Sequence, residues 1–182
     1  RHAVEEEDRH QAQRYLDHSV ARVERLVSQL LSLSRAERDG RGARTRLRLD
    51  AVVGSALDTL LPLAQQRGQR LEADLASTEL SGDERRLATL VDNLVENAIR
   101  YTPDGGRVTV ATLSHDRQAM LVVEDSGPGI EEYEQARVFD RFYRVLGTGC
   151  EGSGLGLAIA REVVEWHDGR IVLDRSVALG GL

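Results

Sequence analysis

The feature that most constrains the fold is a change of pattern at residues 39–44. Before it, residues 10–37 contain neither Gly nor Pro, and apolar residues recur at alternating spacings of four and three, which predicts one long amphipathic helix. Residues 39–44 have the Gly- and charge-rich composition of a linker. We therefore expect three parts: a helical segment at 1–38, a linker at 39–44 and one domain at 45–182.

The apolar stripe of the long helix needs a partner, because a single helix in water cannot bury it. The stripe runs through Leu16, Val20, Val23, Val27 and Leu30. Two arrangements would cover it: packing on the helix's own domain, or a dimeric helical hairpin. Additional leucines widen the stripe, as in a helix bundle, and favour the hairpin.

After the linker, strand-like and helix-like patterns alternate along the chain. The expected helices are 50–66, 83–101, 131–138 and 154–167. The expected strands are 46–49, 69–75, 106–113, 117–124 and 170–174. A short polar turn joins 106–113 to 117–124, so these two strands should pair antiparallel. The pattern predicts an α+β fold, a two-layer sandwich with helices on one face of a mixed sheet.

Composition excludes several classes of function. All 24 basic residues are Arg, so chemistries that require Lys, such as a Walker A loop or a Schiff base, are excluded. The net charge of −6 and the low aromatic content of 4% argue against a nucleic-acid partner. The single cysteine, Cys150, excludes an intramolecular disulfide.

Four polar residues share one face of the helix expected at 83–101. They are spaced at i, i+4, i+7 and i+8: Asn93, Asn97, Arg100 and Tyr101. Amide oxygens are hard, neutral ligands that suit Mg²⁺ when phosphates supply most of the negative charge. An Arg can contact phosphate, and a Tyr ring can stack on a base. An ordinary polar surface stripe is the alternative.

A second motif, residues 125–130, follows the apolar strand 117–124. A carboxylate such as Asp125 only accepts hydrogen bonds, so it can bind the exocyclic amine of adenine and would repel the carbonyl of guanine. Gly127 and Gly129 let the backbone turn sharply and approach a base, with Ile130 beside them. A tight turn after a strand is the structural alternative.

A Gly-rich tract at 147–157 leads into the helix expected at 154–167, where backbone N–H groups suit a phosphate. It also contains the spacing G-x-G-x-x-G followed by Asp174, which resembles a dinucleotide-binding fingerprint. Only eight residues follow Asp174, too few for the further strands of that fold. Just before the tract, residues 139–144 set two Arg among aromatic residues, suited to a phosphate or a partner surface.

The order and spacing of these motifs resemble the cytoplasmic core of a two-component sensor histidine kinase with a Bergerat-type ATP-binding domain. Residues 93–101 are similar to the family's N box, 125–129 to its G1 box, 139–142 to its F box and 152–156 to its G2 box. Residues 10–37 resemble the second helix of its dimerisation and phosphotransfer hairpin. The resemblance implies an α/β sandwich that binds Mg-ATP under a lid at 145–152.

The resemblance also implies roles for single residues. Asn97 would bind Mg²⁺ with Asn93 beside it, Arg100 would meet the phosphates, and Asp125 would bind the adenine amine. Tyr101 would stack near adenine, and Arg141 or Arg144 would meet the γ-phosphate or the partner hairpin. The remaining expected nucleotide contacts are Gly127, Gly129, Ile130, Phe142, Gly152, Ser153, Gly154, Leu155, Gly156 and Leu157.

One departure bears on activity: the family's phosphoacceptor box, a His followed by an acidic residue, is absent. The chain should therefore bind Mg-ATP without phosphorylating itself. The resemblance implies a homodimer through the long helix, a response regulator as partner, and a place in the cytoplasmic portion of a bacterial inner-membrane sensor. Two alternatives remain: a Bergerat-type ATPase, whose relatives carry Glu where Asn93 stands, and a dimerisation module with an impaired nucleotide pocket.

Overall fold

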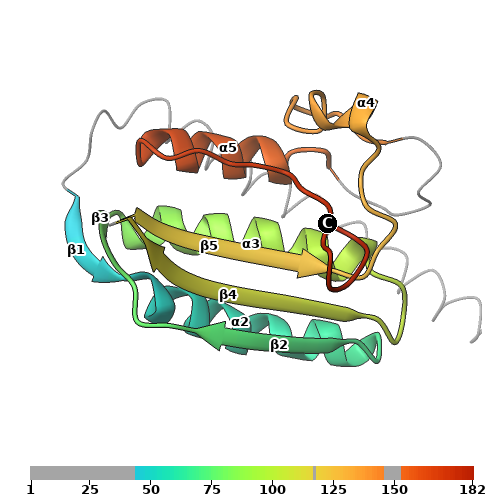
Figure 1. Ribbon diagram of the computed structural model, residues 1–182, viewed down its shortest axis with the longest axis horizontal. Coiled ribbons are helices and arrows are strands. Elements are labelled where there is room, and N and C mark those ends of the chain that lie inside the picture. The colour runs from blue at the N-terminus through green and yellow to red at the C-terminus, as the bar shows by residue number, and fades with distance from the viewer. Residues whose placement is uncertain (1–43, 117, 146–152) are drawn as a thin grey trace, which may run out of the picture. The chain divides into compact units, whose positions relative to one another are not determined.

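The computed structural model describes residues 44–116, 118–145 and 153–182 (Figure 1). The helix predicted at 10–37, most of the linker, Cys150 and Gly152 lie outside the described residues. The described strands are β1 (Thr45–Arg48), β2 (Arg70–Leu75), β3 (Glu79–Gly82), β4 (Arg107–His115) and β5 (Gln118–Asp125). The described helices are α2 (Leu49–Gln66), α3 (Glu84–Tyr101), α4 (Glu132–Gln135) and α5 (Gly156–Trp166).

The main sheet has three strands in the order β2-β4-β5. Strand β2 runs parallel to β4, with Arg70 opposite Arg107, and β4 runs antiparallel to β5, with Val108 opposite Asp125. The mixed sheet and the antiparallel pairing predicted from the sequence are therefore confirmed. This register places Asp125, the end of β5, beside the start of β4 and the loop that leaves α3.

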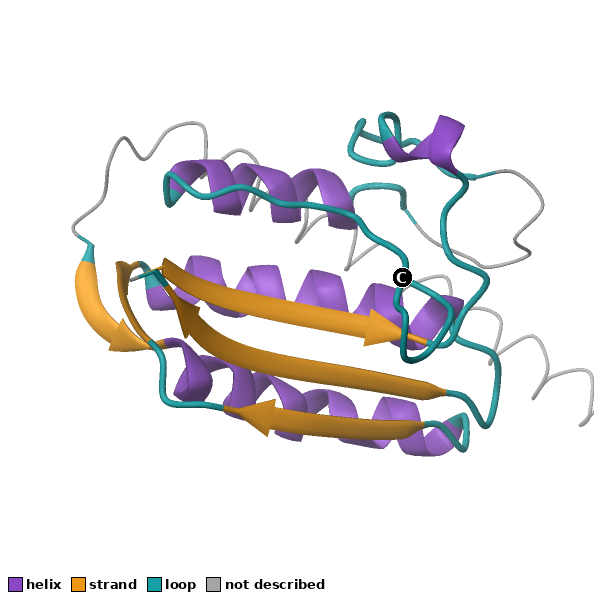
Figure 2. Cartoon of the chain, in the orientation of Figure 1, coloured by secondary structure: helices purple, strands orange, loops and turns teal. Residues whose placement is uncertain are grey.

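Helices α2 and α3 cover one face of this sheet, and α5 packs against α3 (Figure 2). The core lies between the two layers and is formed by buried residues that alternate inward along the strands or repeat along the helices. It includes Val53, Leu57, Leu60, Val91, Val95, Ile99, Val108 and Val110. Burial of these side chains is the main force that holds the α3 face in place. The predicted two-layer sandwich is confirmed.

Helix α3, which carries the first polar motif, begins where the sequence predicts. Asp83 is its N-cap, and the Asp83 carboxylate accepts a hydrogen bond from the Arg86 N–H at 3.0 Å. The Asp83 N–H in turn donates to Nε2 of His167, just after α5, at 3.1 Å. The start of α3 is thereby tied to the end of α5.

Three sequence predictions need correction. Residues 170–174 do not form a strand: their side chains alternate in exposure, but their backbone pairs with no strand in the described part of the chain. The helix predicted at 131–138 is only the short α4. Strand β3 was not predicted; it consists of four residues, and its antiparallel pairing with β1 defines it.

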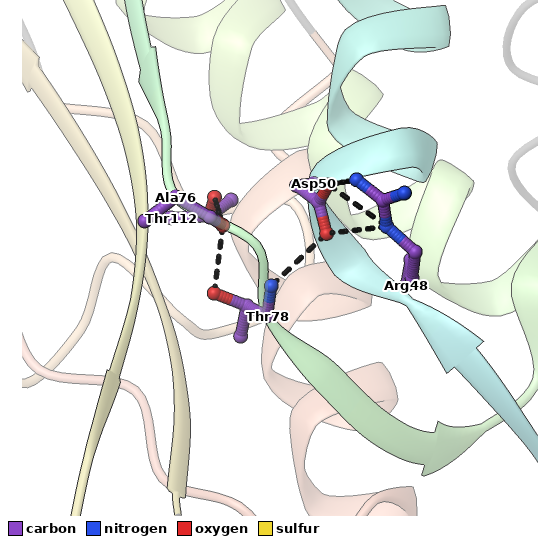
Figure 3. A network of polar contacts seen from close by, with 5 residues as sticks. All are labelled: Arg48, Asp50, Ala76, Thr78 and Thr112. Carbon is purple, nitrogen blue, oxygen red and sulfur yellow. Dashed lines mark hydrogen bonds and ion pairs between the residues drawn. The ribbon is translucent and has the colours of Figure 1, made fainter.

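A buried polar network fixes the start of α2 against the β2–β3 connection (Figure 3). Asp50 accepts a hydrogen bond from the Thr78 N–H at 3.0 Å and pairs with the guanidinium of Arg48. The hydroxyls of Thr78 and Thr112 both donate to the carbonyl of Ala76, at 2.9 and 2.8 Å. Hydrogen bonds from Arg48 and Thr78 lower the pKa of Asp50 to about 2.

Candidate functional site

The second half of α3 meets the first residue of α5. A Cβ added at Gly156 would lie 3.2 Å from Oδ1 of Asn93 and 3.2 Å from Nδ2 of Asn97. Nδ2 of Asn93 donates to the Thr89 carbonyl one turn earlier at 2.7 Å, which fixes the orientation of this amide. Three residues from two separate sequence motifs are thus brought together, and a side chain at Gly156 would crowd both amides.

The start of α5 directs backbone N–H groups to this point. The first N–H groups of a helix have no intrahelical acceptor, and here the Ile159 N–H makes an early helical bond, to the Leu155 carbonyl at 2.9 Å. No acidic side chain occupies the first turn of α5. The positive end of the helix dipole is therefore available to an anion beside Asn93 and Asn97.

A second cluster lies at the end of β5. The Gly127 N–H donates to Oδ1 of Asp125 at 2.7 Å, and a Cβ added at Gly127 would lie 2.9 Å from the Tyr101 carbonyl oxygen. The Asp125 side chain is buried, and this burial raises its pKa, although backbone hydrogen bonds from Gly127 and Leu182 offset part of the effect. A buried carboxylate held by two backbone donors still has lone pairs that can accept a hydrogen bond from a ligand.

Arg100 and the acidic residues before it follow the same side of α3. The Arg100 guanidinium lies 3.5 Å from the Glu96 carboxylate, one turn away. Burial and the charge of Glu96 raise the pKa of Asp92, one further turn back. The guanidinium of Arg100 therefore lies in the last turn of α3, next to Tyr101.

The F-box and G2-box segments are in direct contact. The Phe142 N–H donates to the Gly154 carbonyl at 2.9 Å, and both residues have positive φ, +65° and +70°. A Cβ added at Gly154 would lie 2.7 Å from the carbonyl carbon of Phe142, so this approach requires a glycine. The Phe142 side chain is 63% exposed, and the Arg141 guanidinium lies 3.6 Å from Glu162 of α5.

The other predicted site residues differ in their burial and in their position relative to the two clusters. Leu155 is fully buried, so its side chain belongs to the core and leaves only its backbone for a ligand. Gly129 has a φ of +74° in the turn after Asp125, with Ile130 beside it. Ser153 precedes α5, and its Oγ accepts a hydrogen bond from the Leu155 N–H at 3.2 Å. Leu157 lies in the first turn of α5, and Gly152 is outside the described residues.

Sequence reasoning missed the contribution of the segment 176–182. The Leu182 carbonyl accepts a hydrogen bond from the Asp125 N–H at 2.7 Å, and Gly181 lies directly against the Asp125 backbone. The Ser176 hydroxyl donates to Glu124 at 2.7 Å. The only signal in the sequence was the pair Gly180-Gly181, which marks a close backbone approach without naming its partner.

The described residues contain no group of three or more His, Cys, Asp or Glu side chains that could hold a metal ion. None of the described helices is both long enough and apolar enough to cross a membrane.

Comparison with known proteins agrees with this geometry. Residues 82–181 match the family described as histidine kinase-, DNA gyrase B-, and HSP90-like ATPase. The match covers more than half of the chain, so the protein belongs to this family. Its domain is an ATP-binding domain of the Bergerat type, as the sequence predicted.

The individual relatives are sensor kinases. Sensor histidine kinase RppB of Synechocystis sp. is 38% identical over 167 residues, which are 88% of this chain and 37% of RppB. Sensor protein kinase PmrB of Pseudomonas aeruginosa is 38% identical over 168 residues, 90% of this chain and 35% of PmrB. The chain thus spans little more than a third of these relatives.

The solved structure of the mycobacterial sensor histidine kinase MprB superposes with a TM-score of 0.62 at 33% identity. The superposition covers 69% of this chain and 80% of that one. The predicted resemblance to sensor histidine kinases is therefore confirmed at the level of family and fold.

Proposed function

We propose that residues 45–182 bind Mg-ATP and supply its γ-phosphate to a histidine in a two-component phosphorelay. The observation that carries this proposal is the convergence of Asn93, Asn97 and Gly156 at one end of α5. Two side-chain amides, which are neutral oxygen ligands, lie beside a helix N-terminus, and this combination suits a metal-bound phosphate. The buried Asp125 provides the second half of the pocket, for the base.

Asn97 is the proposed Mg²⁺ ligand, with Asn93 beside it. The donor set fits this ion because amide oxygens are hard, neutral ligands, and because the nucleotide phosphates would supply anionic ones. When bound, Mg²⁺ would neutralise charge on the phosphates. Arg100 and the N–H groups at Gly156 and Leu157 would hold the phosphates beside it.

Asp125 is the proposed selector for adenine. Backbone N–H groups of Gly127 and Leu182 hold the carboxylate, and its remaining lone pairs would accept a hydrogen bond from the exocyclic amine of adenine. Guanine presents a carbonyl oxygen at that position, and two acceptors facing each other in a buried site repel. Tyr101, Gly129 and Ile130 would border the same base.

The remaining assignments concern the whole protein and not only its ATP-binding domain. The relatives that this chain matches are longer than the chain itself. Residues 1–38 are proposed as the C-terminal part of a dimeric phosphotransfer hairpin, with 10–37 as its second helix, joined to the domain through the linker 39–44. Arg141, Arg144 and Phe142 would face the γ-phosphate or that hairpin. The phosphate would pass to a response regulator, and the parent protein would be a bacterial membrane sensor with this portion in the cytoplasm.

Calorimetric titration of Mg-ATP and Mg-GTP tests the pocket. The wild-type chain should bind Mg-ATP and not Mg-GTP, and Asp125→Asn should abolish the preference because the amide would turn a donor toward the adenine amine. Asp74→Asn is the matched control, since Asp74 is an exposed carboxylate on β2. Absence of Mg-ATP binding in a folded sample would refute the proposal.

Incubation with radiolabelled ATP separates the kinase role from hydrolysis. This 182-residue chain should bind ATP without acquiring label, and should transfer label to an added hairpin that carries the acceptor His. Label on the chain itself would contradict the absence of an acceptor. Sustained release of phosphate would instead favour an ATPase, which needs a general base that the Asn93 amide cannot provide.

A further inference from the structure

The turn between α2 and β2 holds the end of α3 with two side chains. This turn, Arg67-Gly68-Gln69, is tight: Gly68 has a φ of +62°, and the Arg67 carbonyl accepts a hydrogen bond from the Gly105 N–H at 3.0 Å. The turn is separated by about thirty residues from the helix end that it contacts. Neither residue belongs to the motifs that indicated a nucleotide pocket.

Gln69 is buried, with 6% of its surface exposed, and its amide points into the end of α3. Nε2 donates to the Ile99 carbonyl at 2.9 Å and to the Thr102 carbonyl at 2.7 Å, with the Pro103 carbonyl also within reach at 3.3 Å, so both of its hydrogens are engaged. Reversing the amide would place Oε1 against these carbonyl oxygens. Oε1 itself has no hydrogen-bond partner among the described residues, so the contribution of this buried side chain is its donor group.

Arg67 contacts the same helix end from its exposed side. Its Nη1 donates to the Arg100 carbonyl at 3.0 Å and also to the Ile99 carbonyl, while Nε donates to Asp104 at 3.0 Å. The last carbonyls of a helix lack intrahelical donors and carry the negative end of its dipole. A guanidinium and a buried amide together satisfy these carbonyls, so the direction in which α3 ends is fixed by residues of another element.

This helix end carries two groups of the proposed pocket. One of the two carbonyls that accept hydrogen bonds from Arg67 belongs to Arg100 itself. The Tyr101 carbonyl lies against Gly127, in the turn that holds Asp125. A shift of the helix end would therefore move the phosphate contact and the base-binding turn at once. Small displacements of binding groups weaken ligand contacts strongly.

We propose that Gln69, with Arg67, is a positioning residue for nucleotide binding: it orients Arg100 and Tyr101 through the backbone at the end of α3 without touching the nucleotide. The inference rests on the proposed function. It predicts that donors at position 69, rather than its polarity or size, determine affinity for Mg-ATP.

Three variants of the 182-residue chain test this role by calorimetry with Mg-ATP, at a temperature where each is folded by circular dichroism. Gln69→Met keeps the length but removes both donors, and should weaken binding by about tenfold, as expected for loss of a group that supports a ligand contact. Gln69→Lys is one atom longer but brings N–H donors to the same carbonyls, where the negative end of the α3 dipole favours its charge, and should recover most of the affinity lost in Gln69→Met. Gln66→Met makes the same change at an exposed position of α2 and should have no effect.

Each outcome decides between the possibilities. Gln69→Met with wild-type affinity would overturn the inference while leaving the pocket intact, and so would an equal loss in Gln69→Met and Gln69→Lys. Failure of the wild-type chain to bind Mg-ATP would overturn both the inference and the proposed function. If Gln69→Met does not fold, Arg67→Met removes donors from the same helix end at a partly exposed side chain and must reproduce the loss.

Discussion

Gly156 begins α5 directly against Asn97 of α3, and a Cβ added at Gly156 would lie 3.2 Å from the Asn97 Nδ2 atom. Few real Cβ contacts are this close, so a side chain at Gly156 would have to displace the amide. Because Asn93 lies at the same distance, the displacement would affect both proposed Mg²⁺-side residues. The packing of two helices here determines the geometry of a ligand site.

Gly156→Ala should therefore weaken Mg-ATP binding by about tenfold, since displacement of binding groups by a fraction of an ångström costs affinity. Thermal stability should change little, because the helix preference of Ala over Gly opposes the crowding of the two amides. Calorimetry and thermal melts measure the two effects separately. Gly54→Ala, also in a helix but with an added Cβ at an ordinary 3.7 Å from Leu75, is the control and should bind normally. Equal affinity in both variants would contradict the site.

Asp125→Asn should raise stability at neutral pH while abolishing selective ATP binding. Burial raises the pKa of Asp125, so the ionised carboxylate destabilises the folded state above that pKa. Below the ordinary pKa of 3.8 the group is protonated in both states, and the difference disappears. Thermal melts of both proteins at pH 7 and near pH 3.5 should show a higher melting temperature for the variant only at pH 7. A lower melting temperature for the variant at pH 7 would show that the charge is compensated.

Asp50→Asn should instead lower the stability of the folded state at neutral pH. Hydrogen bonds from Arg48 and Thr78 lower the pKa of Asp50 to about 2, so its ionised form stabilises the folded state above pH 3.8. This stabilisation is lost as the pH falls from about 4 to about 2. The variant should melt below wild type at pH 7, and the gap should close near pH 2. Denaturant melts across this range measure it, and a gap independent of pH would contradict the role of the charge.

Sequence patterns correctly predicted the elements that depend on residues close together in the chain. Helix α3 followed from the helical spacing of its polar residues, and the pairing of β4 with β5 followed from two apolar segments joined by a short turn. Residues 170–174 contain a short apolar run, which is typical of a strand. Such a run does not indicate whether another strand offers its backbone, and here none of the described strands does.

Contacts between distant segments were beyond the reach of sequence patterns. Asn93, Asn97 and Gly156 were each predicted as site residues, but their mutual contact depends on how α5 packs against α3. Gln69 gave no signal at all: a Gln after a glycine turn is ordinarily exposed, and its burial follows from the position of the α3 end. Strand β3 was missed for the same reason, since its partner β1 precedes it by about thirty residues.

Trp166 lies at the opposite end of α5 from Gly156, about 15 Å away at the helical rise per residue. The guanidinium groups of Arg44 and Arg86 stack on its ring, 4.9 and 4.6 Å from the centroid. Its indole N–H is buried and has no acceptor among the described residues. The ring therefore contributes through its faces rather than through its polar atom, and links Arg44, the last residue of the linker, to α3 and α5.

Trp166→Leu should lower the free energy of unfolding by about 1–2 kcal/mol, because both cation–π contacts are lost. Trp166→Phe should cost less, since it keeps an aromatic face and removes the unpaired N–H, whose burial costs about 1–3 kcal/mol. Chemical denaturation of the three proteins measures the order. Affinity for Mg-ATP below the melting range should be unchanged in both variants, because the ring is remote from Asn93 and Asn97. An equal loss of stability in both variants would mean that the indole N–H, and not the aromatic face, stabilises this end of α5.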